Sequence, residues 1–391
     1  MKIENKIKIF LTFFEKCVDK CRFVLYNLFN SIREVIEIKK RTAKYRLWIK
    51  HRNEKNLKRR TAQKSAIKAK RTKVAEYNRS LKRTISYNEE TRNYEFSAPL
   101  RFSFIKNPNE TSDFFNQIIA FISNRNNFGK KIFIDISGIE ELTIDALMYL
   151  LAIVNNLNEN FRFKYRFSGN APKDPAVRKL FNESGFYNYV KYQGNALLTQ
   201  KSDTIQIVSG QNSDTDTAKQ LSDFVSNRAN VPQKVCRFIY VMMIELMSNT
   251  HKHAYNDSDI LSPQWYCFAQ CDSNVVNFTF VDTGEGIPST VRKNFAEKLD
   301  ILRIKGECKY VTSALDGKFR TATNLLHRGK GLPKIREICA SEKIKNMRII
   351  TNKADVLVEK DKYTSKSLNK AIRGTVYYWQ IDLSSMKGEQ T

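Results

Sequence analysis

Three polar residues stand four positions apart in a segment that otherwise reads as an apolar helix. Glu245, Asn249 and His253 lie in a helical pattern that opens at Pro232 and runs to about Tyr255. Four residues turn a helix through about 400°, so the three side chains form one row that drifts slowly around it. Polar groups on the core side of such a helix are costly to bury unless they have partners. The row therefore marks a candidate binding or reaction site.

Three glycine-bearing segments follow this helix. An apolar strand pattern over 275–281 runs directly into Asp282-Thr-Gly284-Glu-Gly286. A carboxylate at a strand end followed by two glycines can read the edge of a base, because the backbone approaches the ligand closely there. About forty residues later, Arg328-Gly329-Lys330-Gly331-Leu332 places a glycine turn at the start of a helix. The N-terminal amides of a helix suit phosphate. Finally, Gly374-Thr375 begins a strand that runs to about residue 381.

The segments upstream alternate between strand and helix patterns. Residues 130–137 read as a buried strand, 142–157 as an apolar helix, 161–167 as an alternating strand and 175–189 as an amphipathic helix. This alternation predicts a small α/β domain over residues 96–195. A polar, turn-rich stretch over 210–217 then leads into the region that carries the polar row and the glycine segments.

The glycine segments and the polar row together resemble the GHKL superfamily: gyrase-type topoisomerases, heat-shock chaperones of the ninety-kilodalton class, histidine kinases and mismatch-repair ATPases. The row resembles the N box, in the form seen in anti-sigma-factor serine kinases, where Ala-Tyr follows the histidine as it does here. The segments 282–286 and 329–332 resemble the two glycine boxes, and Gly374-Thr375 resembles the closing threonine strand. A single glycine motif is weak support, but here four motifs occur in the family's order. The resemblance covers residues 198–388 and implies a two-layer α/β sandwich of the Bergerat type.

The same resemblance implies a site for ATP and Mg²⁺. Asn249 would coordinate Mg²⁺, the ion bridging the phosphates, and Glu245 would be the general base that polarises the attacking water or acceptor. Asp282 would accept a hydrogen bond from the adenine amino group, with Thr375 supporting it through water. Residues 289–328 would form a mobile lid. The residues expected to bind ATP are Asn249, His253, Asp282, Gly284, Gly286, Gly329, Lys330, Gly331, Leu332 and Thr375.

Residues 96–195 resemble a STAS domain, the fold of anti-sigma-factor antagonists. The strand over 132–138 and the segment 142–147 are similar to that family's strand and its Asp-Ser-Ser-Gly-Leu helix start. Ile144 stands where the family's phosphorylated serine would fall. The neighbouring Thr143 is either a substitute phosphoacceptor or a helix N-cap.

Charge concentrates near the N-terminus. The 391 residues carry a formal net charge of +27, and residues 39–83 hold 19 Lys and Arg against Glu54 and Glu76. The first proline is Pro99 and the first glycine is Gly129, so residues 1–95 are expected to form a helical arm. Tyr45 and Trp48 among the charges favour nucleic acid as the partner of this segment. An acidic membrane surface is the alternative polyanion. A helix that is only solvated, with no partner, is the third possibility. The apolar stripe over 3–38 fits a face for a partner helix or a membrane surface, and it fits equally well a helical hairpin that packs on itself.

Composition excludes several classes of protein. Hydrophobic residues make up 41% of the chain, which excludes disorder throughout. No uncharged apolar run of about 18 residues predicts a transmembrane helix, and the N-terminus lacks the shape of a signal peptide. Seven scattered cysteines do not fit a secreted disulfide scaffold, so we expect reduced thiols and a cytoplasmic location.

Three functions share the predicted site. The first is an ATPase whose Mg-ATP state regulates engagement of a partner through the STAS-like domain and the basic arm. The second is a serine/threonine kinase of the anti-sigma class that acts on a separate STAS partner. The third is a non-catalytic scaffold that binds ATP as a structural ligand. Whether ATP closes a homodimer stays open at this point.

Overall fold

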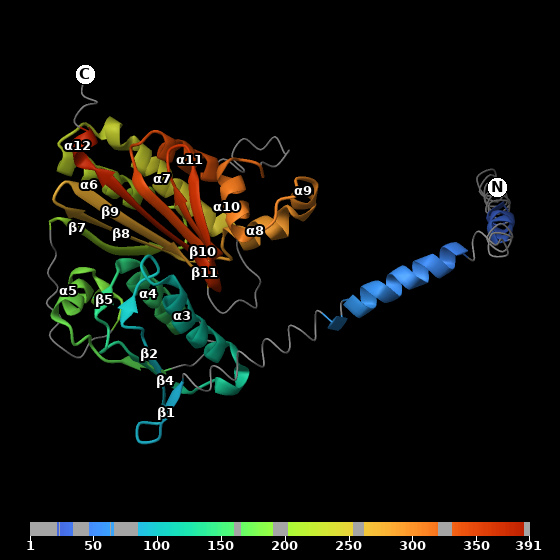
Figure 1. Cartoon of the computed structure of the whole chain (residues 1–391), viewed down its shortest axis with the longest axis horizontal. Coiled ribbons are helices and arrows are strands. Elements are labelled where there is room, and N and C mark those ends of the chain that lie inside the picture. The colour runs from blue at the N-terminus through green and yellow to red at the C-terminus, as the bar shows by residue number, and fades with distance from the viewer. Residues whose placement is uncertain are drawn as a thin grey trace, which may run out of the picture. The chain divides into compact units, whose positions relative to one another are not determined.

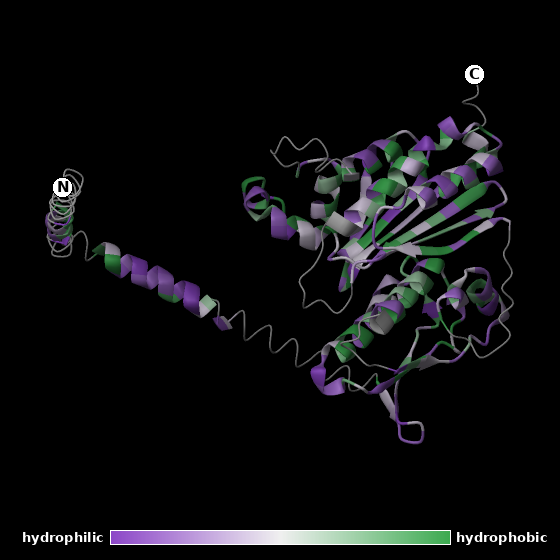
Figure 2. Cartoon of the chain, turned by 180° about the vertical axis from the view of Figure 1, so that it is seen from behind, coloured by the Kyte–Doolittle hydropathy of each residue, from purple (hydrophilic) through white to green (hydrophobic). Residues whose placement is uncertain are grey.

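The computed structural model describes residues 22, 24–33, 47–62, 64–65, 85–159, 166–190, 202–252, 262–319 and 331–386. The chain forms two units, Met1–Lys82 and Arg83–Thr391. In the first unit, residues 24–33 and 47–62 are helical, and nearly all their side chains are exposed. Figure 2 shows the helix over 47–62 to be mainly hydrophilic. None of the described helices combines the length and the apolar character needed to cross a bilayer.

The second unit holds the strands and most of the helices (Figure 1). Their order is β1 (Ser86–Asn88), β2 (Asn93–Ser97), β3 (Arg101–Phe102), α3 (Pro108–Ser123), β4 (Lys131–Asp135), β5 (Glu141–Leu142), α4 (Ile144–Glu159), β6 (Arg166–Gly169), α5 (Pro175–Glu183), β7 (Thr204–Gly210), α6 (Thr215–Ala229), α7 (Gln233–Lys252), β8 (Trp265–Asp272), β9 (Val275–Asp282), α8 (Ile287–Asn294), α9 (Ala296–Ile301), α10 (Glu307–Leu315), α11 (Gly331–Ala340), β10 (Lys345–Val358), β11 (Tyr363–Asp382) and α12 (Leu383–Met386). Short 3₁₀ turns cover Arg125–Asn127 and Phe186–Asn188. The fold is mixed α/β with several sheets, as the sequence predicts.

We call residues 86–190 the middle region. Its four-stranded sheet has the order β1-β2-β4-β6, in which β2, β4 and β6 are parallel and β1 is antiparallel to β2. The parallel strands are joined through α3 and α4, as parallel neighbours require a crossover. A two-stranded sheet of β3 and β5 completes the region.

We call residues 202–386 the C-terminal region. Its five-stranded sheet has the order β10-β11-β9-β8-β7 and is antiparallel throughout. One apolar cluster joins this sheet to α6, α7, α10 and α11, with Leu246, Phe278 and Ile335 at most 1% exposed. The strands therefore use one face of the sheet to hold α7, the helix that carries the polar row.

The other face of this sheet packs on the middle region. Helix α4 contacts β8 and β9, and α3 contacts β11 as well as β2 (Figure 1). The two helices thus lie between the two sheets and share one core with residues of both, such as Ile132 and Val281. No residue from Ala146 to Val154 is more than 8% exposed. Burial on both sides explains why α4 is apolar around its whole circumference.

The predicted elements compare closely with the observed ones. The strands expected over 130–137 and 275–281 are β4 and β9, the apolar helix over 142–157 is α4, and the helix expected after Pro232 is α7. The helix predicted over 175–189 ends at Glu183, and a 3₁₀ turn follows. The strand expected over 161–167 is described only from Arg166 onward, as β6.

The prediction of helix up to residue 95 is wrong over its last ten residues, where β1 and β2 form a hairpin. The Asn88 side chain accepts hydrogen bonds from the N–H groups of Glu90 and Thr91, both at 3.1 Å. Such local bonds compete with a helix and favour a turn. A hairpin therefore forms here without glycine or proline.

Candidate functional site

The polar row on α7 meets the start of α11. Glu245 and Asn249 are half-buried, one turn apart, beside the buried Leu246. A Cβ placed on Gly331 would lie 2.6 Å from Glu245 Oε2 and 3.2 Å from Asn249 Oδ1. The first residue of α11 therefore touches both side chains, and only glycine leaves them room. The structure brings Gly331 into contact with two predicted residues that precede it by more than 80 positions.

Asn249 has unused hydrogen-bonding capacity. Its Nδ2 is shielded from solvent and has no hydrogen-bond partner among the described residues. A buried polar group without a partner costs about 1–3 kcal/mol, and an acceptor such as a phosphate oxygen would remove that cost. Gly331, the first described residue of α11, lies beside Asn249, and the N-terminal end of a helix favours an anion.

The Asn249 side chain fits Mg²⁺. Its amide oxygen is the type of ligand that Mg²⁺ takes, and the ion usually needs only one or two protein ligands beside phosphate and water. Within the described ranges, no three His, Cys, Asp or Glu side chains gather closely enough to hold a metal by themselves.

Asp282 ends β9 in a buried position and is 8% exposed. Strand β9 pairs Asp282 with Thr375 of β11 on one side and with Trp265 of β8 on the other. Asp282 Oδ1 accepts the N–H of Gly284 at 2.9 Å, and the Thr375 hydroxyl also hydrogen-bonds to the carboxyl group. Burial outweighs these bonds and raises the pKa of Asp282 from its ordinary 3.8 to about 6. At pH 7 the group is a poorly solvated carboxylate, well suited to accept from a ligand N–H.

Two residues of β10, Thr351 and Asn352, brace the turn after Asp282. Thr351 Oγ1 accepts the N–H of Ile287 at 3.1 Å, and Asn352 Oδ1 accepts the N–H of Ser289 at 3.0 Å. A Cβ on Gly286, where φ is +85°, would lie 2.8 Å from both side chains. Sequence reasoning missed Thr351 and Asn352, although a polar pair that interrupts an apolar strand was a signal that could have found them.

Gly374 allows β11 to approach the end of β9. Its φ is +79°, and a Cβ there would lie 1.9 Å from the carbonyl oxygen of Asp282. We expect Gly374→Ala to lower the free energy of unfolding by at least about 3 kcal/mol, because both backbones must shift to relieve the overlap. Gly129 is the matched control, since it has the same φ of +79° with nothing within 4 Å.

Gly129→Ala should therefore cost only the strain of a left-handed alanine, about 1–2 kcal/mol. Urea titration of the two variants beside the wild-type protein measures both values. Equal costs in the two variants would contradict the close approach of β11 to Asp282.

Several predicted site residues lie outside the described residues. These are His253, Gly329 and Lys330, together with residues 320–328 of the expected lid. The remainder of that lid segment contains most of α8 and all of α9 and α10. A small apolar cluster joins this part of the chain, and Val291, Leu299 and Phe319 belong to it. Leu332 and Ile287 pack against this cluster and against the main core.

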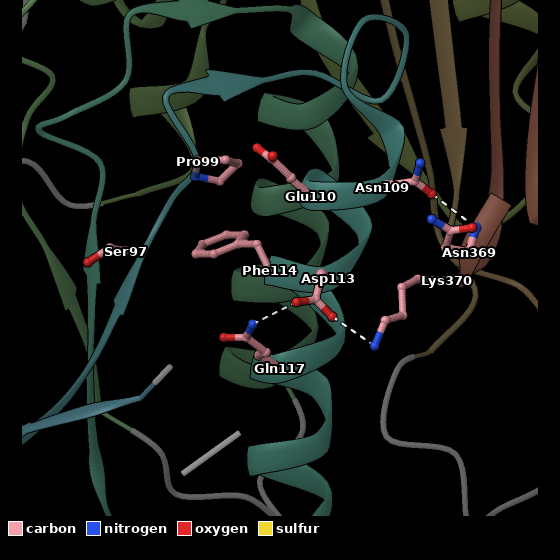
Figure 3. Close-up of a pocket in the computed structure, with 9 residues that line it drawn as sticks. All are labelled: Ser97, Pro99, Asn109, Glu110, Asp113, Phe114, Gln117, Asn369 and Lys370. Carbon is pink, nitrogen blue, oxygen red and sulfur yellow. Dashed lines mark hydrogen bonds and ion pairs between the residues drawn. The ribbon is translucent and has the colours of Figure 1, made fainter. Parts of the chain in front are cut away.

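Two cavities lie away from these residues. One, of about 460 Å³, is lined by α3, the stretch from Ser97 to Pro99, and Asn369 and Lys370 of β11 (Figure 3). The other, of about 430 Å³, lies on α6 beside Ile205. Neither is lined by Glu245, Asn249 or Gly331, or by Asp282 and the residues bonded to it.

In comparisons with known proteins, no family model matches the sequence, and no curated protein is significantly similar to it.

Proposed function

We propose that the C-terminal region binds Mg-ATP in a GHKL-type site of the Bergerat fold and hydrolyses it. The observation that carries this proposal is the contact of Gly331 with Glu245 and Asn249. It joins two of the motifs on which the resemblance rests. The buried carboxyl group of Asp282, hydrogen-bonded to Gly284 and Thr375, supports the proposal as a candidate acceptor for the adenine amino group.

Each residue then has a chemical task. Asp282 accepts the adenine amino group, and Gly284 and Gly286 keep the turn beside it free of side chains. Asn249 holds Mg²⁺, which neutralises charge on the phosphates when it is bound. Glu245 orients the attacking water and takes its proton. The start of α11 at Gly331 lies beside Glu245 and Asn249, and its backbone would approach the phosphates there.

The nucleotide state would in turn regulate how the chain engages a partner. We propose that the middle region is STAS-like. Its helix α4 is in direct contact with β9, the strand that ends at Asp282. The helix over 47–62 exposes cationic side chains, with Arg52 stacked 4.9 Å above the ring of Trp48. We propose that this arm binds nucleic acid or another polyanion. We also propose that the protein is cytoplasmic.

The metal assignment predicts the behaviour of Asn249→Ala. This variant should lose detectable Mg-ATP binding in isothermal titration calorimetry without unfolding earlier than the wild-type protein, because Asn249 Nδ2 makes no bond within the described structure. Asn227→Ala on α6 is the control, since Asn227 is an exposed asparagine of a neighbouring helix. Equal ATP affinity in Asn249→Ala and wild type would contradict the site.

Incubation with γ-labelled ATP distinguishes the three functions that share this site. Label released as inorganic phosphate supports hydrolysis, and label in a serine or threonine of an added STAS protein supports a kinase. Label that stays in bound ATP supports a scaffold. Transfer to Thr143 of the same chain is not expected, because its hydroxyl is shielded from solvent.

A further inference from the structure

Four successive carbonyl groups of β11, those of residues 371–374, each accept a hydrogen bond from a side chain. Two of the four donors belong to β10. Thr351 Oγ1 donates to Gly374 O at 3.0 Å, and Asn352 Nδ2 donates to Ile372 O at 3.2 Å. These two donors also brace the turn after Asp282, so they belong to the candidate site itself.

The other two donors come from the middle region. Asn116 Nδ2, on α3, donates to Ala371 O at 2.8 Å. Tyr149 OH, on α4, donates to Arg373 O at 2.8 Å. Successive carbonyls of a strand point in opposite directions, and here they alternate between the middle region and β10.

This part of β11 depends on such bonds because its strand pairing is irregular. Pairing with β9 begins only at Thr375. On the other side, β11 pairs with β10, but between Ser367 and Thr375 only Ile372 has a partner there, Asn352. The register shifts on either side of Asn352. A buried carbonyl without a ladder partner must be satisfied by another donor.

Aromatic packing fixes the Tyr149 ring and so directs its hydroxyl towards Arg373 O. The side chain is 1% exposed, and its ring centroid lies 4.7 Å from that of Phe115 and 5.1 Å from that of Phe104. Burial raises the pKa of Tyr149, and the nearby Asp282 carboxylate raises it further, so the phenol keeps its proton and donates.

The contact between α3 and β11 continues away from the site. Asn109 Oδ1 accepts the N–H of Asn369 at 3.0 Å, and Lys370 pairs with Asp113 at 3.2 Å (Figure 3). The cavity of about 460 Å³ opens beside these contacts. Polar groups of α3 and α4 thus hold β11 from Asn369 to Arg373, directly before Gly374 and Thr375.

We propose that Asn116 and Tyr149 are positioning residues for the base end of the nucleotide site, through which the middle region sets the affinity for the adenine base. They hold β11 so that Gly374 closes against the Asp282 carbonyl and Thr375 reaches the Asp282 carboxyl. A movement of α3 or α4 against the sheet therefore changes base recognition and leaves the phosphate end at Glu245 and Asn249 in place. This inference rests on the proposed function.

The test compares Tyr149→Phe with Tyr189→Phe in the full chain. Tyr189 OH donates to Ile207 O on β7 at 2.9 Å, so both substitutions delete a phenol-to-carbonyl bond between the same two regions. Only Tyr149 contacts the segment before Thr375. The probes are Mg-ATP and Mg-inosine triphosphate, which has a carbonyl oxygen where adenine has the amino group.

Tyr149→Phe should raise the Kd for Mg-ATP about 3- to 10-fold, the effect of losing one hydrogen bond. It should leave the Kd for inosine triphosphate within about twofold, so the preference for ATP falls. Tyr189→Phe should keep the wild-type preference. Asn116→Ala, at a half-buried position, is a second variant with the same expected loss.

Amide hydrogen exchange gives a readout that needs no nucleotide. Residues 369–376 should exchange faster in Tyr149→Phe than in Tyr189→Phe. An unchanged preference for ATP in a variant that binds ATP overturns this inference and leaves the proposed function standing. A wild-type protein that binds neither nucleotide overturns the proposed function, and unchanged exchange over 369–376 overturns the positioning role by itself.

Discussion

Glu245→Gln should keep Mg-ATP binding and lower turnover by a factor of about 10²–10⁴. The substitution removes the charge that accepts a proton from water but keeps the size of the side chain. That size matters because Gly331 packs directly against Glu245 Oε2. Steady-state phosphate release measures turnover, and calorimetry with Mg-ATP measures binding in the same preparation.

Glu337→Gln is the control for this experiment. Glu337 lies exposed on α11 and pairs with Lys334 at 2.9 Å, outside the cluster of Glu245 and Asn249. Its neutralisation should change turnover less than twofold. If Glu245→Gln released phosphate at the wild-type rate, Glu245 would not be the base, and hydrolysis would need another explanation.

Asp282→Asn should weaken nucleotide binding and stabilise the free protein at the same time. The carboxylate accepts the adenine amino group in the proposed complex, and losing a charged hydrogen bond should raise the Kd for Mg-ATP about 10- to 100-fold. In the free protein, ionising this buried group at pH 7 costs about 3 kcal/mol, because its pKa is about 6 instead of 3.8. Asparagine avoids that cost and keeps an oxygen for the Gly284 N–H.

The pH dependence follows from the sign of this shift. Between about pH 4 and pH 6 the folded protein holds a proton on Asp282 that the unfolded chain has lost. The contribution of Asp282 to the free energy of unfolding therefore decreases as pH rises through this range and levels off above pH 6. Asp282→Asn removes this decrease, so the gain in stability should be largest above pH 6 and vanish near pH 4.

Asp135→Asn is the control with the opposite sign. Partial burial acts to raise the pKa of Asp135, but hydrogen bonds from Asn170 and Ser137 outweigh it and leave the pKa lowered. Neutralising this carboxylate should therefore reduce stability at pH 7. Urea unfolding at several pH values compares the two variants, and a loss of stability in Asp282→Asn would contradict the burial argument.

The sequence alone was enough to predict which elements carry the candidate residues. Periodicity and turn residues indicated α7, β9 and the start of α11, because a helical stripe, an apolar run and a glycine turn are local properties of the chain. The spacing of Glu245 and Asn249 predicts one row, since four residues bring side chains back to the same face. The mixed α/β class followed from the alternation of these patterns.

Local patterns also misjudged one boundary. The absence of glycine and proline before Pro99 indicated helix up to residue 95, but Asn88 starts a hairpin through its side chain. The relevant bonds are specific to one turn conformation, and composition does not record them. The ATP, Mg²⁺ and partner assignments rest on the resemblance and remain proposals.

Only the tertiary structure decided what these elements touch. The contact of Gly331 with Glu245 requires two helices that are distant in sequence to pack on one sheet. Thr351 and Asn352 became site residues because an irregular register places them against Gly286, and no local pattern encodes that register. The pattern over 142–157 predicted an apolar helix, but the second sheet that buries α4, and the bond from Tyr149 to Arg373 O, depend on packing between regions. The sequence determines which chemical groups each element carries. Tertiary packing determines which partner satisfies each buried polar group.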